Sequence, residues 1–224
     1  DEISTGLKVA TAKDNGAVWS IAQTMRSDVS SLTKVEEALS LGSATVGTAR
    51  TAAESISKML TLAKDYVLGA GDLSNAATRT KLMADLDAIG AQIGDILASA
   101  SFNGVNLVNS ATVPTVNVVG SITRTTGGAI GTEEIAVVGA DLTTVAGVLT
   151  GVADADIDTT AELKTLLTNI ETQFDKVNGA AAAFGTAQKQ IDIQAEFVGN
   201  FKVALKEGIG AMVDADMEEA SARL

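Results

Sequence analysis

The feature that most constrains this chain is an apolar residue at every seventh position through its N-terminal part. The row is Val18, Met25, Leu32, Leu39, Val46, Ala53, Leu60 and Val67, and no Pro interrupts it. A spacing of seven gives a seam of period 3.5, which one helix presents to partner helices. About 50 residues in one helix extend over roughly 75–80 Å. The sequence therefore predicts a long helix that needs equally long partners.

A second row with the same period lies toward the C-terminus. It consists of Leu163, Ile170, Val177, Phe184, Ile191, Val198, Leu205 and Met212. We expect the two rows to pack side by side. The companion row, offset by four, begins with Leu167 and Phe174 and ends with Lys202, Ile209 and Asp216. A seam that lacks its partner and an exposed helix end would both show this loss of apolar character.

Local signals give the limits of the helices. The first helix is expected to begin near Asp14 or Asn15, which can cap a helix N-terminus, and to end near the glycines of residues 69–72. A second apolar pattern predicts a helix from Ser74 to Ala98 that runs back along the first. Thr159 and Glu162 form a capping box, which places the start of the third helix at Thr160 and its end beyond Lys206.

The region between the second and third helices has a different character. Residues 101–104 read Ser-Phe-Asn-Gly and predict a turn. Residues 113–119 and 134–138 are rich in β-branched side chains, which indicates short strands and at least one hairpin, and 141–149 is expected to form a short helix. The predicted fold class is mainly α: an elongated antiparallel bundle of long, coiled-coil-like helices with a small β-hairpin region in the middle.

Composition excludes several classes of function. The 224 residues include no Cys and no His, which removes thiol catalysis, disulfides and most zinc sites. The formal charge of −12 argues against a nucleic-acid partner, and no apolar run approaches the roughly 18–20 residues that span a membrane. We therefore expect no enzyme activity, no cofactor and no membrane partner.

Two places in the sequence are candidates for binding chemistry. Asp154, Asp156 and Asp158 alternate like the start of a calcium loop, but the sixth and twelfth positions of that loop would be Thr159 and Thr165. Because a calcium loop needs Gly and Glu there, solvated capping acids are favoured and no metal is expected. Trp19 is interpreted as an anchor in the bundle or in a subunit interface, and not as a ligand platform.

Four motifs carry a family resemblance. Residues 6–22 include Gly-Leu-Lys-Val and Ala-Lys-Asp-Asn-Gly-Ala, and residues 101–105 read Ser-Phe-Asn-Gly-Val. Residues 184–188 read Phe-Gly-Thr-Ala-Gln, and residues 214–217 read Asp-Ala-Asp-Met. In order and spacing they resemble the conserved segments of bacterial flagellins. Trp19, Lys189-Gln190 and Val213 depart from the usual pattern, and the chain is most similar to flagellins of alphaproteobacterial type.

The resemblance implies a structural subunit of the bacterial flagellar filament that self-assembles for motility. It divides the chain into residues 1–104, two long helices of the helical core domain; 105–158, the hairpin and a short variable region; and 159–224, the C-terminal long helix. It implies type III export, an extracellular location on the flagellum, and other flagellin subunits with export and capping proteins as partners. Family members carry further helical segments before Ile3 and after Leu224, and without those segments the 224-residue chain is expected to be a monomer.

Two alternatives to the filament subunit stay open at this stage. A hook–filament junction protein shares the helical frame, although a longer middle region would have favoured it. A flagellin-like cell-surface protein that binds a polysaccharide is the other alternative, although Trp19 and Tyr66 are single aromatics within predicted helices.

The resemblance also places a receptor-recognition region on the first long helix. Flagellins that activate the flagellin-sensing Toll-like receptor carry L-Q-R-x-R-E-L-x-V, whereas residues 60–68 of this chain read Leu-Thr-Leu-Ala-Lys-Asp-Tyr-Val-Leu. Leu60 matches the first position, but Leu62 and Lys64 stand at the two Arg positions and Asp65 at the Glu. We expect recognition by this degenerate segment to be weak or absent.

Overall fold

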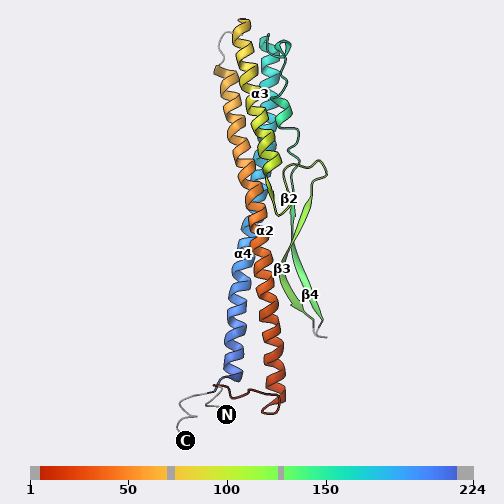
Figure 1. The fold of residues 1–224 in the computed structure, drawn as a ribbon, viewed down its shortest axis with the longest axis vertical. Helices are drawn as coiled ribbons and strands as arrows, with labels where there is room; N and C mark the ends of the chain where they lie inside the picture. Colours follow the sequence, from red (N-terminus) through yellow and green to blue (C-terminus); the bar gives the residue numbers. More distant parts are fainter. Residues whose placement is uncertain (1–5, 70–73, 126–128, 216–224) are drawn as a thin grey trace. The chain divides into compact units, whose positions relative to one another are not determined.

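The computed structural model describes residues 6–69, 74–125 and 129–215. The long helices are α2 (Gly16–Gly69), α3 (Ala76–Ser99) and α4 (Thr160–Val213). The strands are β1 (Ser101–Phe102), β2 (Val105–Asn106), β3 (Thr115–Arg124) and β4 (Ile130–Val138), and two short 3-10 helices are η1 (Ala146–Val148) and η2 (Asp154–Asp156) (Figure 1). The mainly α prediction, with three long helices and small hairpins in the middle, is confirmed.

Each long helix begins at a polar cap. The side chain of Asn15 accepts a hydrogen bond from the amide of Val18 at 3.2 Å, and that of Asn75 accepts from the amide of Ala77 at 2.9 Å. At the start of α4 the amide of Thr159 donates to Glu162 Oε2 at 3.2 Å, while the amide of Glu162 donates to Thr159 Oγ1 at 3.3 Å. These reciprocal bonds confirm the capping box that the sequence predicts.

The chain divides into two compact units, which are described separately. The first comprises the described residues within 1–41, 118–135 and 191–224, and the second those within 42–117 and 136–190. Both units contain part of α2 and part of α4.

In the first unit, α2 and α4 pack through the seven-residue rows. Leu32, Leu39, Ile191 and Val198 are fully buried. Lys202 on α4 pairs with Glu36 on α2 beside this seam. A smaller cluster is built around Val9, Ala22 and Val213, with Trp19 packed against it, which confirms Trp19 as an anchor within the fold.

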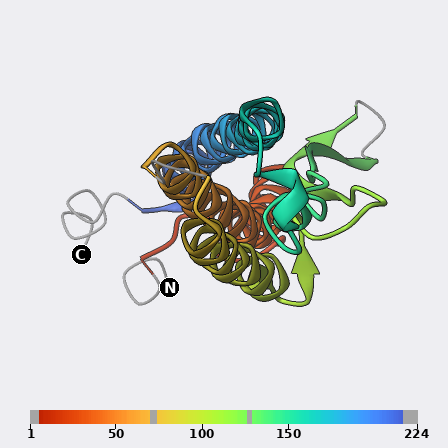
Figure 2. The same ribbon diagram turned by 90° about the horizontal axis from the view of Figure 1, so that it is seen from above.

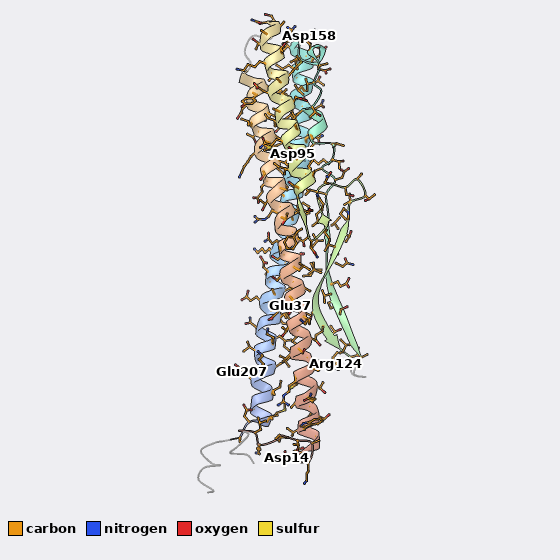
Figure 3. All side chains as sticks on the ribbon, viewed as in Figure 1. Asp14, Glu37, Asp95, Arg124, Asp158 and Glu207 are labelled. Carbon is orange, nitrogen blue, oxygen red and sulfur yellow. The ribbon has the colours of Figure 1, made fainter. Side chains whose placement is uncertain are left out.

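The hairpin of β3 and β4 is fastened to the helices of the first unit by two polar contacts. Gln194 on α4 donates through Nε2 to the carbonyl of Gly120 at 2.9 Å. Arg124, which is labelled in Figure 3, lies at the end of β3 and forms an ion pair with Asp28 on α2. Gly120 suits this position because a Cβ there would lie 3.3 Å from Ile135. Within the first unit, the hairpin lies beside α2 and α4 and not between them (Figure 2).

In the second unit, α2 and α4 run antiparallel. Ser57 on α2 bonds Asn178 at 2.7 Å, and further along α2 Lys64 pairs with Glu171 at 2.6 Å, so residue numbers rise on one helix as they fall on the other. The buried residues of this unit include further members of both seven-residue rows. They also include residues on the inner face of α3 and in the loop after β4. Among them are Val46, Ala53, Leu60, Val67, Leu82, Leu86, Ile93, Leu142, Val145, Leu149, Ile170, Val177 and Phe184.

The turn predicted at residues 101–104 is the tip of a small antiparallel hairpin. Asn103 and Gly104 have φ values of 50° and 79°, and β1 pairs with β2 on either side. Positive φ at both central residues is the geometry that a two-residue hairpin turn requires. The turn prediction is confirmed, whereas the two strands were not predicted.

In the middle region, the observed bounds of two strands and one helix differ from the predicted ones. The strand predicted at 113–119 begins instead at Thr115, because Val113 has a φ of 42° and Pro114 has no amide hydrogen, and it continues to Arg124. The strand predicted at 134–138 begins at Ile130. The helix predicted at 141–149 is reduced to turns and η1, where Asp141 accepts from the amide of Thr143 at 3.0 Å.

A buried charge in the seam should unfold the protein. Leu32→Asp places a carboxylate at a fully buried position of α2, which we expect to lower the free energy of unfolding by about 4 kcal/mol or more. Leu41→Asp is the matched control, since Leu41 lies on the same helix and is 49% exposed. Thermal melts followed by circular dichroism should separate the two variants. Equal melting temperatures would show that the seam is assigned to the wrong face.

Two glycines of α3 should respond oppositely to the same substitution. A Cβ at Gly90 would lie 2.6 Å from Thr150 Cγ2 and 3.2 Å from the carbonyl of Ala146, whereas a Cβ at Gly94 meets nothing within 4 Å. We expect Gly90→Ala to destabilise the protein by about 1–3 kcal/mol and Gly94→Ala to stabilise it by up to about 1 kcal/mol. Urea titrations of both variants measure the difference. A stable Gly90→Ala protein would contradict the close packing of α3 on η1.

Candidate functional site

Residues 60–68 of α2 include both buried and exposed side chains, which lie on different faces of the helix. Leu60 is fully buried in the seam, whereas Leu62 and Tyr66 are 43% and 42% exposed. Lys58, Leu62 and Tyr66 are spaced four apart and share one helix face. We call these three exposed residues the α2 ridge. The structure therefore separates the predicted recognition residues, with Leu60 directed inward and Leu62 outward.

The two charged residues of this segment differ in their surroundings. Lys64 Nζ lies 2.6 Å from Glu171 Oε2 on α4, so its charge is already paired within the chain. Asp65 is exposed and borders a cavity of about 540 Å³ between α2 and α3. The cavity is lined by Asp65, Tyr66, Gly69, Ala77, Thr78, Lys81, Leu82 and Asp85. Among the described lining residues, Tyr66 is the one aromatic side chain, and the two carboxylates of Asp65 and Asp85 outnumber the one cation, Lys81.

A second exposed surface lies on α4 and was not predicted. Ile193, Phe197 and Phe201 are 57%, 54% and 41% exposed, and the two rings stack with their centroids 6.0 Å apart. We call these three residues the α4 ridge. Ile191 and Val198 of the same helix are fully buried, so α4 carries one apolar face in the core and another on the surface. The spacing of four from 193 to 201 is the sequence signal that could have revealed it.

The two ridges differ from the other exposed apolar residues in the spacing of their side chains. Within residues 6–69, 74–125 and 129–215, they are the places where large exposed apolar side chains lie four apart on one helix. The other large exposed apolar side chains are Ile21, Leu41, Leu68, Ile130, Val138 and Val203. Rows of residues four apart are the ridges through which helices pack on one another. Both surfaces are therefore suited to contact a further helix.

The acidic residues before α4, Asp154, Asp156 and Asp158, make contacts within the fold. Arg79 on α3 donates from Nε to Asp154 Oδ1 at 2.6 Å and from Nη2 to Oδ2 at 3.1 Å. This hydrogen bond from Arg79 holds the pKa of Asp154 below its usual range. Asp156 accepts from the amide of Ala153 at 2.9 Å, and a hydrogen bond with Glu162 raises the pKa of Asp158. In the described part of the chain no group of three or more potential metal ligands is found.

Taken together, the long helices and the exposed apolar ridges are typical of a helical structural protein. Family models agree with this class. The N-terminal helical region of bacterial flagellin matches residues 1–112, and the C-terminal helical region of bacterial flagellin matches residues 167–224. The chain belongs to the bacterial flagellin family.

Individual relatives match nearly the whole chain. It is 31% identical to flagellin FljK of Caulobacter vibrioides, covering 99% of this chain and 78% of the relative. It is 34% identical to a flagellin of Brucella melitensis, covering 100% of this chain and 79% of that one. Flagellin C of Rhizobium meliloti is 31% identical, with 99% and 81% covered. The expected similarity to alphaproteobacterial flagellins is confirmed.

Solved structures share the fold. Bacillus cereus flagellin superposes with a TM-score of 0.52 at 23% identity, covering 74% of this chain and 88% of that one. A putative flagellar hook-associated protein from Vibrio parahaemolyticus gives a TM-score of 0.63 at 13% identity, covering 90% and 100%. Identities this low show a common fold alone, so the second likeness does not favour the junction protein.

Family membership establishes the general function. The chain is a structural subunit of the bacterial flagellar filament, in a family whose members polymerise with other flagellin subunits. Its place is the flagellum. Of the helices in the described residues, none combines the length and apolar character needed to cross a membrane.

The contact between Arg79 and Asp154 should give a pH-dependent contribution to stability. Because the pKa of Asp154 is lowered in the folded state, the contribution is present above the pKa of an unfolded Asp, about 3.9, and is lost as the pH falls through the lower folded value. Arg79→Met should therefore lower the melting temperature at pH 7 and have a smaller effect below about pH 3.

The control for this experiment is Lys34→Met. Lys34 pairs with Glu37 on the surface of α2, with side chains 74% and 61% exposed, and such pairs contribute little. Melting curves of both variants at pH 7 and at low pH make the comparison. An Arg79→Met effect that grows on acidification would contradict the assigned contact.

Proposed function

We propose that this flagellin is exported through the flagellar type III apparatus and assembles outside the cell with the help of capping proteins. We further propose that the Leu62 face of α2 serves contacts between subunits and does not support recognition by the flagellin-sensing Toll-like receptor. Family membership supports the first part. The exposure of Leu62, combined with its lack of any hydrogen-bond donor, is the observation that carries the second.

We propose the division into residues 1–104, 105–158 and 159–224 as a functional one. The outer two segments would supply the helical core of the subunit, and the middle segment its surface. The family models stop at residue 112 and resume at residue 167, close to these limits, which supports the division.

The side chains at the receptor-recognition positions support the proposal that the receptor recognises this chain weakly or not at all. Where receptor-active relatives have their first Arg, Leu62 cannot bind a carboxylate, a contact that Arg makes with two parallel hydrogen bonds. Lys64 keeps a positive charge at the second Arg position, but Glu171 neutralises it at 2.6 Å. Asp65 is one methylene shorter than the Glu that it replaces. Loss of a desolvated Arg contact at an interface typically costs about 2 kcal/mol, or roughly thirtyfold in affinity.

A cell reporter assay tests this proposal. We expect the chain to activate the receptor weakly or not at all, and Leu62→Arg combined with Asp65→Glu to restore a response, because the double change returns the guanidinium and the longer carboxylate. Leu62→Gln with Asp65→Glu is the matched control, since it adds polarity without a guanidinium. Circular dichroism should show the same helix content in all three proteins. Strong activation by the unchanged chain would contradict the proposal.

A further inference from the structure

The α2 ridge and the α4 ridge match each other in geometry. Each has three exposed residues spaced four apart on a regular helix, Lys58, Leu62 and Tyr66 on α2 and Ile193, Phe197 and Phe201 on α4. Such rows fit into the grooves beside the corresponding row of another helix. On the α4 ridge the stacked rings of Phe197 and Phe201 are already ordered, so binding would cost little of their conformational freedom.

The two ridges also match in charge. Lys58 precedes Leu62 by one helical turn on the same face, and Glu196 flanks Phe197 along the α4 ridge. Both charged side chains are exposed. Among the described residues, neither takes part in a hydrogen bond or an ion pair. Opposite charges beside apolar ridges orient two surfaces and select their register.

We propose that the α4 ridge of one copy packs on the α2 ridge of a second copy, with Glu196 facing Lys58. The occupant is a second copy because the family polymerises with itself, and the two ridges complement each other in shape and charge. The inference rests on the proposed use of the Leu62 face for subunit contacts. Because the contact joins two different surfaces, it leaves one free ridge at each end and can be repeated along a filament.

Crosslinking in assembled filaments tests the pairing, because the chain has no Cys of its own. Filaments are prepared from a flagellin in which this sequence, with Leu62→Cys and Phe197→Cys together, is joined to the terminal helical segments that family members carry, and they are treated with a short bismaleimide. The expected result is a ladder of covalent multimers on a denaturing gel. Each single variant should give monomers. Dimers from either single variant would show that like surfaces meet, which overturns the proposal.

One further measurement separates this inference from the proposed function. Leu62→Cys in filaments should be protected from a monofunctional maleimide. If it is protected but no ladder forms with Phe197→Cys, the pairing is wrong while the Leu62 face remains a subunit contact; if it reacts freely, both proposals fail. Leu41→Cys with Phe197→Cys is the matched control, and a ladder from this pair would also overturn the proposal.

A charge exchange provides an independent test for the case in which the Cys variants do not assemble. Lys58→Glu and Glu196→Lys should each raise the subunit concentration needed for filament growth by about tenfold, because each brings like charges together. The double exchange should restore growth, which light scattering measures. Both side chains are exposed, so a role in folding alone would not produce the recovery. Normal growth of both single variants would overturn the proposal.

Discussion

The structure depends on burying aliphatic side chains along two seven-residue rows. Leu32, Leu39, Ile191 and Val198 in one unit, and Leu60 with its neighbours in the other, are removed from water almost completely. Each such side chain contributes roughly 1.5–3 kcal/mol relative to an exposed one. Aromatic residues make up only 3% of the sequence, so this repeated aliphatic contact must hold the helices together. The hairpin is fastened to helices that the seam has already positioned.

The surface ridges follow from how little of each helix the seam occupies. A row of period 3.5 covers a narrow stripe, which leaves most of the circumference of α2 and α4 facing outward. In an isolated globular protein that outward face is usually polar. Here Leu62 with Tyr66, and Ile193 with its two phenylalanines, keep apolar side chains on it. A subunit that must recognise copies of itself needs such surfaces, and their small size limits unspecific association before assembly.

The sequence predicts the helices well because their signals are local and repeated. Asn15, Thr159 and Glu162 cap helices through contacts with residues a few positions away, and those contacts are found in the structure. Strand limits are harder to predict, because the length of β3 depends on its pairing with β4 and on Gln194, which lies 74 residues from Gly120. The ion pair of Lys64 with Glu171 spans 107 residues and requires the relative register of two helices. The α4 ridge is visible in the spacing but lies outside the row that defines the core.

The distribution of the two largest chromophores has a practical consequence. The chain has one Trp and one Tyr. Trp19 belongs to the first compact unit, where it packs beside Val9 and Val213, and Tyr66 belongs to the second. Each unit therefore contains its own intrinsic fluorophore, and selective excitation of tryptophan reports on the first unit alone. Emission of the two side chains during denaturation can show whether the units melt together or one after the other, without any added label.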